Sequence, residues 1–402
     1  MASWLAVLVA AFFTVPALIL CLDSLLRAIF LVVSWRPLVA DNEAQPAWPL
    51  ESVAVVIPAH NEAAIIKRTL SHLQSQVASG GLFVIADNCS DETAEQARQA
   101  GAQVWERQAP YEQSKGAALR WFVTAARDAL QRFQAIAVFD ADSEVDGNFL
   151  AVARAALARG AEAAQGCARP RGGHSPAADL AAYSETLSHA IDDVARERLG
   201  WPVPLRGRGM VFRRPVLEAI LPHVHTKVED VEMSLLLAAQ GRRTRFLPNA
   251  FLADFDRAAP AGMARQRARW LQGQRQVWRY HRHLIARLLL SGRPGVVALV
   301  LGTLLKPKTL LLLLKALWLI WAACAAWLSL WPPGWSWIIL GLTSFTLGSD
   351  VLYYVLGLRK VDTPRRYAWS LIQAPAYVAL WLWSLAISLV SAKPWMSTRS
   401  KE

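Results

Sequence analysis

The sequence has 402 residues, enough for one or two domains, and 54% of them are hydrophobic, including 18 tryptophans. A chain this apolar is unlike a fully soluble protein, so we expect part of it to lie in lipid. The net charge of +12 is compatible with binding to nucleic acid, to an anionic membrane surface or to a phosphate-rich ligand. The four scattered cysteines predict neither a disulfide framework nor a zinc site.

The N-terminal segment, residues 1–50, is predicted to hold a membrane anchor and a linker. Residues 4–22 carry no charge, and as a helix they would be about 28 Å long, enough to cross a bilayer. The first basic residues, Arg27 and Arg36, follow this span. We therefore expect a retained anchor with the N-terminus outside and the following residues in the cytoplasm. Residues 41–49 are polar and contain proline, which is typical of a linker.

Residues 51–257 alternate short apolar runs with helical patterns. We expect strands at 53–57, 82–86 and 135–139, and helices at 62–76 and 91–100. This alternation predicts an α/β, Rossmann-like domain with a mostly parallel sheet. In such sheets ligands bind at the carboxyl ends of the strands, where the polar segments 58–62, 87–91 and 140–143 fall.

Two carboxylates, Asp140 and Asp142, follow the strand predicted at 135–139. Carboxylates at positions i and i+2 after a strand can converge on one hard cation such as Mg²⁺ or Mn²⁺, which bridges readily to phosphate. A cation there would neutralise the charge that develops as a phosphorylated leaving group departs. The alternative is a solvated loop. Nearby, Lys115 opens a predicted helix, whose N-terminus attracts phosphate.

Two further motifs lie downstream. Glu229 and Asp230 precede a helix, where they either complement the helix dipole or supply a general base for a hydroxyl nucleophile. Helical spacing places Gln266, Arg269 and Trp270 on one face; arginine binds phosphate and tryptophan offers a flat surface to a sugar ring. The alternative for residues 258–305 is a set of basic amphipathic helices at a membrane surface, a setting that also disfavours nucleic acid as a partner.

Residues 306–402 are predicted to be membrane helices. The apolar runs 308–330 and 335–358 form a hairpin, and basic flanks place both of its ends in the cytoplasm. The last apolar stretch, 367–390, either spans the membrane or lies in its inner interface with a kink at Pro375. The positive-inside rule favours the interface, and three or four spans in total remain open.

These motifs, in this order, resemble family 2 glycosyltransferases with a GT-A domain. The resemblance is greatest to the membrane-embedded branch that includes cellulose, hyaluronan and poly-N-acetylglucosamine synthases. The C-terminal segment Trp395–Arg399 also looks like the ending of some bacterial exopolysaccharide transferases.

The resemblance implies a role for each matching position. It implies that the nucleobase pocket is lined by Pro58, Glu62 and Asp87, and that Lys115 and Asp140 contact the nucleotide. It implies that Asp142, together with Asp140, ligates Mg²⁺ or Mn²⁺. The loop beside the acceptor would be Gly207, Arg208 and Gly209. Asp230 would be the base, supported by Glu229. Gln266, Arg269 and Trp270 would close over the diphosphate and the acceptor.

The function expected from this resemblance is an inverting glycosyltransferase of a bacterial-type inner (plasma) membrane, multi-pass, with its catalytic domain in the cytoplasm. The donor would be a nucleotide-sugar, such as a UDP-sugar. The acceptor would be a lipid-linked or polysaccharide glycan of the cell envelope, extended by a β-linkage. Membrane lipids would be partners and nucleic acid would not. The alternatives are a processive synthase that acts with a synthase or export partner or as an oligomer, an inactive nucleotide-binding scaffold, and a transporter built around Lys315 and Asp350.

Overall fold

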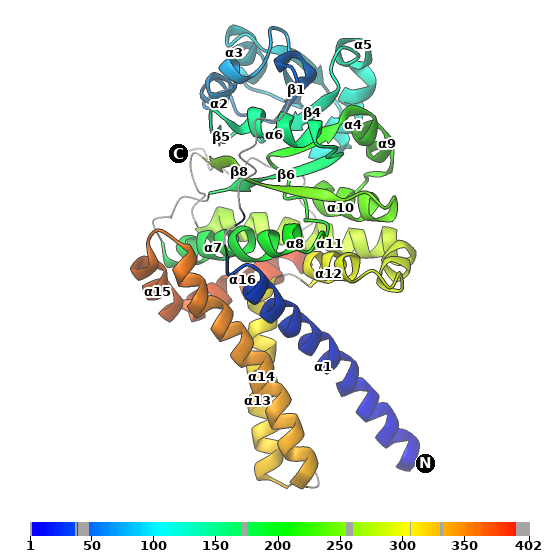
Figure 1. Cartoon of the computed structure of the whole chain (residues 1–402), viewed down its shortest axis with the longest axis vertical. Coiled ribbons are helices and arrows are strands. Elements are labelled where there is room, and N and C mark those ends of the chain that lie inside the picture. Colours follow the sequence, from blue (N-terminus) through cyan, green and yellow to red (C-terminus); the bar gives the residue numbers. More distant parts are fainter. Residues whose placement is uncertain are drawn as a thin grey trace.

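The computed structural model describes residues 2–36, 38, 48–169, 175–254, 260–305, 307–329 and 333–390. Figure 1 shows three parts: an α/β domain, a layer of helices beneath it, and helices that project away from that layer. Most of the predicted linker and the C-terminal segment Trp395–Arg399 lie outside the described residues.

The α/β domain is built on one eight-stranded sheet in the order β3-β2-β1-β4-β7-β6-β8-β5. The first four strands in this order, β3, β2, β1 and β4, are parallel to one another. Strand β7 is antiparallel to β4 and to β6, and strand β5 is antiparallel to β8. The mostly parallel sheet expected from the sequence is confirmed, and its second half is mixed. The strands are β1 (Val53–Ala59), β2 (Leu82–Asp87), β3 (Gln103–Arg107), β4 (Ala135–Val138), β5 (Ser143–Val145), β6 (Ala163–Ala168), β7 (Met210–Arg213) and β8 (Thr244–Asp254).

Helices cover both faces of the sheet, so the central strands are buried on both sides and are apolar throughout. Side chains of β1 alternate between the two cores: Val55 and Ile57 join one, and Val56 joins the other. The first core is completed by α2 (Ile66–Leu73), α3 (Thr93–Gln99) and α6 (Phe149–Ala158). The second is completed by α4 (Lys115–Ala125), α5 (Arg127–Leu130), α9 (Arg214–Ile220) and α10 (Glu229–Ala239).

The helix expected at 62–76 begins later, at Ile66, because the preceding backbone is held by the loop after β2. The Glu62 N–H donates to Thr93 Oγ1 at 2.8 Å, and the Ala63 N–H donates to Asp91 Oδ2 at 3.1 Å. Asp91 also accepts from the Thr93 N–H at 3.0 Å, so the same carboxylate contacts both the backbone before α2 and the first residue of α3.

The helical layer lies between the α/β domain and the projecting helices (Figure 1). Helix α11 is kinked at His281, whose Nε2 lies 2.6 Å from Glu232 Oε1 of α10. The layer therefore connects directly to the helix that carries Glu229 and Asp230. Its members are α7 (Pro176–Leu187), the π-helical turn η3 (Ser188–Asp193), α8 (Val194–Arg198), α11 (Pro260–Leu289), α12 (Pro294–Leu304), α15 (Pro364–Ile372) and α16 (Ala374–Val390).

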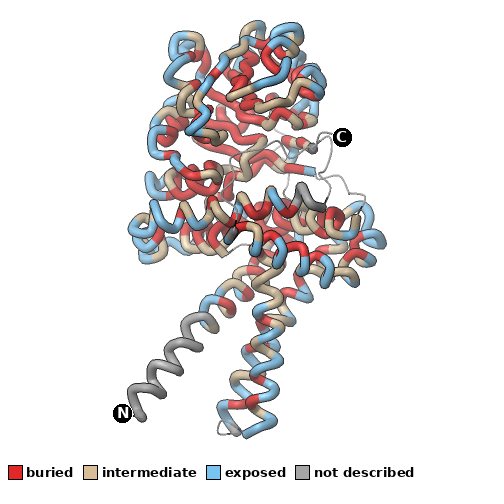
Figure 2. The backbone as a smooth tube through the Cα atoms, turned by 180° about the vertical axis from the view of Figure 1, so that it is seen from behind, coloured by how far each residue is buried: buried red, intermediate tan, exposed pale blue. Residues whose placement is uncertain are grey.

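Three helices project from the layer on the side away from the sheet: α1 (Ala2–Val33), α13 (Lys308–Trp327) and α14 (Pro333–Gly357). Within the described residues, Lys308–Trp327 and Gly334–Lys360 are each long and apolar enough to cross a membrane. The predicted hairpin is therefore confirmed as two helices, whose surfaces are largely exposed in Figure 2. Helix α1 includes the predicted anchor, residues 4–22.

The last apolar stretch forms α15 and α16, which meet at 66° and would make a third span only if the bent pair crossed as one. The break falls at Gln373, two residues before Pro375 rather than at the proline itself. Pro375 lies in the first turn of α16, where the missing N–H of a proline costs no helical hydrogen bond, so the new helix begins just before it. Helix α16 packs against α7 and α11 through Tyr377, Leu380 and Trp381. This packing keeps α16 along the helical layer.

The charges in the apolar runs are paired with one another. Lys315 of α13 is fully buried, and its Nζ lies 2.7 Å from Asp23 Oδ2 of α1 and 2.9 Å from Asp350 Oδ2 of α14. Arg27 of α1 lies 3.2 Å from Asp23 and 3.1 Å from Asp350. This four-residue network joins the three projecting helices, and the pairing offsets the cost of burying each charge between them.

Candidate active site

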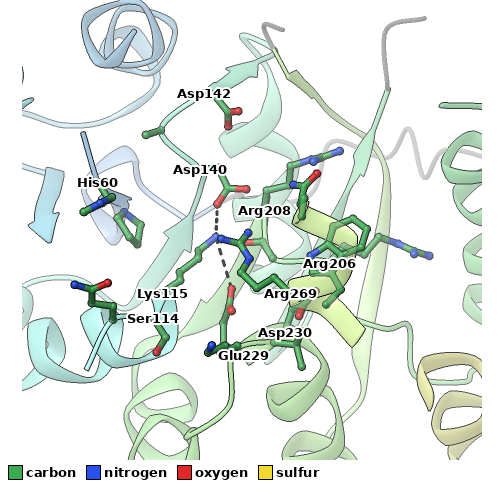
Figure 3. A pocket seen from close by; sticks show the side chains of 18 of the residues that line it. His60, Ser114, Lys115, Asp140, Asp142, Arg206, Arg208, Glu229, Asp230 and Arg269 are labelled. Atoms are coloured by element: carbon green, nitrogen blue, oxygen red, sulfur yellow. Dashed lines mark hydrogen bonds and ion pairs between the residues drawn. The ribbon is translucent and has the colours of Figure 1, made fainter. Parts of the chain in front are cut away.

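A cavity of about 230 Å³ opens at the carboxyl ends of β1 and β4, where the sheet changes from parallel to antiparallel pairing. Figure 3 shows its side chains converging from the strand ends, from α4 and from α10. The lining comprises Pro58, His60, Glu62, Gln113, Ser114, Lys115, Asp140, Ala141, Asp142, Arg206, Gly207, Arg208, Lys227, Val228, Glu229, Asp230, Gln266, Arg269 and Trp270.

Lys115 lies at the centre of the charged cluster. Its helix begins there because Ser114 Oγ accepts a hydrogen bond from the Ala117 N–H at 3.1 Å, which is an N-cap. The Lys115 ammonium pairs with Asp140 and donates to the Gly207 carbonyl, and its Nζ lies 4.0 Å from Glu229 Oε1. Burial opposes the charged form, yet the surrounding carboxylates outweigh it and raise the pKa of Lys115. The lysine is therefore a permanent cation at the N-terminus of α4.

Asp140 and Asp142 both line the cavity, directly after β4. Among the described residues no group of three or more His, Cys, Asp or Glu side chains is arranged to hold a metal. Two carboxylates suit a divalent cation that completes its coordination with phosphate oxygens and water, which is how Mg²⁺ commonly binds. The residues present therefore fit a cation that arrives with a phosphorylated ligand.

The Glu229–Asp230 pair begins α10 and faces the loop around Gly207. A methyl group built on Gly207 would lie 3.8 Å from Asp230 Oδ2 and 3.9 Å from Glu229 Oε1. Burial raises the pKa of Glu229 to about 7; Lys115 opposes this shift and the Asp230 charge adds to it. The cavity thus holds a carboxyl group that changes its protonation near neutral pH.

Helix α11 contributes the third wall of the cavity. Gln266, Arg269 and Trp270 line it together, as their spacing predicts, and the Trp270 side chain remains 45% exposed. Arg267 lies between them in sequence but is buried on the other face of α11. Its guanidinium carbon is 4.9 Å from the ring centroid of Tyr377 in α16. One short motif therefore contacts both the cavity and the helical layer.

Two residues assigned from the sequence lie outside the lining. Asp87 is fully buried; its Oδ1 accepts from Arg107 Nη1 at 2.7 Å, while its Oδ2 has no hydrogen-bond partner within the described part of the chain. Gly209 has a φ of +63°, and a Cβ there would come within 2.6 Å of Leu252. Its backbone therefore requires glycine for conformation and packing.

Sequence reasoning missed Arg206, which lines the cavity beside Gly207. Asp193 of η3 holds it through a two-pronged ion pair, with Arg206 Nη2 at 2.6 Å from Asp193 Oδ2 and Nε at 3.2 Å. Its position next to the Gly-Arg-Gly segment was the only sequence signal. Gln113, Ser114 and Lys227 were also missed, although the first two flank Lys115.

We expect Glu229→Gln to stabilise the ligand-free protein at alkaline pH. The folded-state pKa of about 7 exceeds the unfolded value of 4.5, so the folded state binds the extra proton between these values and the free energy of unfolding falls as the pH rises through them. Above pH 7, burial of the charged Glu229 side chain lowers the free energy of unfolding by on the order of 3 kcal/mol. The uncharged amide of glutamine removes this destabilisation. Thermal unfolding should show the gain at about pH 8 and little of it at about pH 4.5. The exposed Glu95→Gln should show no such pH dependence; an equal gain at both pH values would contradict this account.

A family model described as glycosyltransferase like family 2 matches residues 49–273, more than half of the chain. No curated protein matches it. Among solved structures, a mannosyltransferase from Pyrobaculum calidifontis in complex with GDP-Man and Mn²⁺ is 16% identical, with a TM-score of 0.49; the match covers 94% of this chain and 99% of that one. Glucosyl-3-phosphoglycerate synthase from Mycobacterium tuberculosis, in complex with Mn²⁺, UDP and phosphoglyceric acid, is 19% identical, with a TM-score of 0.39 and coverage of 57% and 84%.

Proposed function

Because this chain belongs to the glycosyltransferase-like family 2, we propose that it transfers a sugar from a nucleotide-sugar, such as a UDP-sugar, to a lipid-linked or polysaccharide acceptor, with inversion to a β-linkage. One observation carries the proposal. A single cavity is lined by the Asp140–Lys115 pair on one side and the Glu229–Asp230 pair on another, and its third wall is α11, a helix of the helical layer.

The donor's diphosphate would lie between Lys115, Arg269 and the two carboxylates Asp140 and Asp142. A bound Mg²⁺ or Mn²⁺, held by Asp142 and Asp140, would neutralise phosphate charge. Lys115 is preorganised for this role, since Asp140 and the Gly207 carbonyl already fix its ammonium. The nucleobase would lie near Pro58 and Glu62, and Asp87 Oδ2, which has no hydrogen-bond partner among the described residues, is buried outside the lining.

Asp230 would remove the proton from the acceptor hydroxyl as it attacks the anomeric carbon. The new C–O bond forms as the bond to the phosphate oxygen breaks, so the nucleotide leaves with that electron pair and the configuration inverts. Glu229 would support the base by keeping Lys115 and the Gly207 loop in place. The acceptor would lie against the loop Gly207, Arg208 and Gly209.

The acceptor surface is supported by two side chains at the cavity mouth. Trp270 is half exposed and offers a flat face to a sugar ring. Arg208 is anchored by Glu185 of α7, with Nη2 and Oε1 2.5 Å apart. Both side chains come from, or are held by, the helical layer, which favours an acceptor that approaches from the membrane.

The arrangement of the helices supports a membrane location for the reaction. Helices α1, α13 and α14 project from the layer on the side away from the cavity-bearing sheet (Figure 1). We propose a bacterial-type plasma membrane, with the N-terminus outside and the catalytic domain in the cytoplasm, as the basic residues flanking α1 and α14 suggest.

The direct test is a donor screen on the purified full chain, with UDP- and GDP-sugars, Mg²⁺ or Mn²⁺, and lipid-linked or oligosaccharide acceptors. Nucleotide release coupled to glycan extension supports the proposal, and product length separates single addition from processive synthesis. If no donor is hydrolysed or transferred under any of these conditions, the enzyme proposal fails and a nucleotide-binding scaffold becomes the better account.

We expect Asp142→Ala to weaken metal-dependent donor binding by at least about tenfold, because one of only two carboxylates at the proposed cation is lost. Isothermal titration of the donor with and without EDTA measures it. Asp146→Ala is the matched control, since Asp146 is an exposed aspartate four residues away. Activity that survives both EDTA and Asp142→Ala would remove the metal from the proposal.

A further inference from the structure

A second, smaller cavity lies between the α/β domain and the projecting helices. Its volume is about 40 Å³, and its walls come from α1, η3, α8, α12 and Lys308, the first residue of α13. We call it the membrane-side cavity. Arg206 lines both this cavity and the active-site cavity, so the two are neighbours.

The acidic side chains in its lining already have cationic partners. Asp192 accepts from Lys308 Nζ at 2.5 Å and from Tyr353 Oη at 3.0 Å. Asp193 is held by Arg206 and lies 2.9 Å from His189 Nδ1. Asp23 belongs to the Lys315 network. The carboxylates therefore hold neighbouring cations in place and need no further ligand.

Two arginines in the lining keep unused donors. Arg196 Nε and Arg27 Nη2 are buried without a hydrogen-bond partner among the described residues, and the two side chains are only 4% and 3% exposed. A buried, charged N–H without an acceptor costs free energy. The lining also carries four cationic side chains against three acidic ones. An anion with several acceptor oxygens would accept hydrogen bonds from the unused N–H donors and would also balance the excess positive charge.

The position of the cavity selects the kind of anion. Lys308 begins a helix long enough to cross the membrane, and Phe30 and Arg27 lie near the cytoplasmic end of α1 proposed above. The cavity thus lies at headgroup depth, with the partly exposed Leu26 and Leu301 at its edge. Judged by the space that one buried water requires, the cavity would hold roughly three waters, or one phosphate group.

We propose that the membrane-side cavity binds the phosphate of a lipid headgroup, and that the acceptor is a phosphate-bearing glycolipid whose sugar reaches the active-site cavity past Arg206. The acceptor role rests on the glycosyltransferase function proposed above. The phosphate does not react; it anchors the lipid so that a saccharide hydroxyl lies near Asp230. This arrangement names the acceptor class as an anionic lipid-linked saccharide.

Two variants change the cavity in different ways. Gly302→Val fills it without changing charge, since a Cβ at Gly302 already meets Arg196 Nη2 at 2.9 Å. Arg196→Gln removes the charge but also a hydrogen bond to the Ala298 carbonyl. Arg287→Gln is the matched control, because Arg287 is exposed on α11 in the same layer and does not line the cavity.

Binding is measured on the full chain in detergent micelles with three probes: dodecyl phosphate, dodecanol and inorganic phosphate. We expect dodecyl phosphate to bind at least tenfold more tightly than the other two, and Gly302→Val and Arg196→Gln each to weaken it at least tenfold, with Arg287→Gln unchanged. Equal binding of phosphate and alcohol, or binding insensitive to both variants, overturns the site. Inorganic phosphate binding as tightly as dodecyl phosphate overturns the lipid source and assigns the site to a free anion.

The acceptor role is tested with a pair of glycolipids that differ only by the phosphate, dodecyl phosphate-linked glucose and dodecyl glucoside. Gly302→Val should raise the KM of the phosphate-linked acceptor about tenfold, leave its kcat and the KM of the donor unchanged, and leave the neutral acceptor unaffected. Equal effects on both acceptors overturn the acceptor role. If dodecyl phosphate binds specifically while no nucleotide-sugar is used at all, the site stands and the glycosyltransferase function fails, so the two failures are distinguishable.

Discussion

Asp230→Asn is expected to lower kcat by about 10²–10⁴-fold while changing the donor Kd by less than about threefold, the loss typical of removing a general base. The amide has nearly the shape of the carboxylate but cannot accept the proton of the attacking hydroxyl. Its carbonyl oxygen retains the hydrogen bond that Asp230 Oδ1 accepts from the Val231 N–H at 2.9 Å. Single-turnover transfer and donor titration separate the two quantities.

The control for this substitution is Asp128→Asn, which removes a carboxylate from the exposed side of α5 without touching the cavity. Both variants should fold, so equal thermal unfolding midpoints are expected. A loss of donor binding in Asp230→Asn would reassign Asp230 to the donor site. Retained turnover would remove it as the base and leave Glu229 as the other carboxylate of the pair that lines the cavity.

Lys315→Met is expected to lower the free energy of unfolding by about 3–5 kcal/mol, the range for removing one partner of a buried ion pair. The network of Asp23, Arg27, Lys315 and Asp350 has balanced charge, and the substitution leaves one carboxylate uncompensated. Asp350 and Lys315 are both fully buried between the projecting helices, so water cannot replace the lost partner.

The double variant Lys315→Met/Asp350→Asn tests the same account, because it restores charge balance with Asp23 and Arg27 still paired. We expect it to recover part of the loss in thermal unfolding in detergent. Leu314→Met is the control; it is adjacent in sequence, but 48% exposed on the outer side of α13, and should be neutral. A double variant less stable than Lys315→Met would show that geometry, rather than charge balance, sets the cost.

Helix α11 contacts both the active-site cavity and the helical layer. Gln266, Arg269 and Trp270 face the active-site cavity, whereas Arg267 packs on Tyr377 and Trp381 of α16 with centroid distances of 4.9 Å. His281 at the kink pairs with Glu232, one turn after Glu229 in α10. Movement of α11 relative to the sheet would therefore displace groups at both the proposed donor and base positions.

Much of the site was predictable because strand ends are local features. The apolar runs at 53–57 and 135–139 predict strands, and parallel strands bring their carboxyl ends to one edge of a sheet. Helical spacing likewise places Gln266, Arg269 and Trp270 on one face without reference to the rest of the fold. Arg206 was missed because its place in the cavity depends on Asp193, an aspartate on a different element.

The sequence by itself determined the α/β class, the order of the polar strand ends, and the two long apolar helices, since each follows from periodicity and length within one segment. Only the tertiary structure decided which charges meet. In the sequence, Lys315 is an isolated charge within an apolar run. The fold brings Asp23 and Asp350 next to it, and both pair with its ammonium. The raised pKa of Glu229 also depends on burial created by other elements. Ion pairing and burial act between segments far apart in the chain, and so they are set by the packing of the fold.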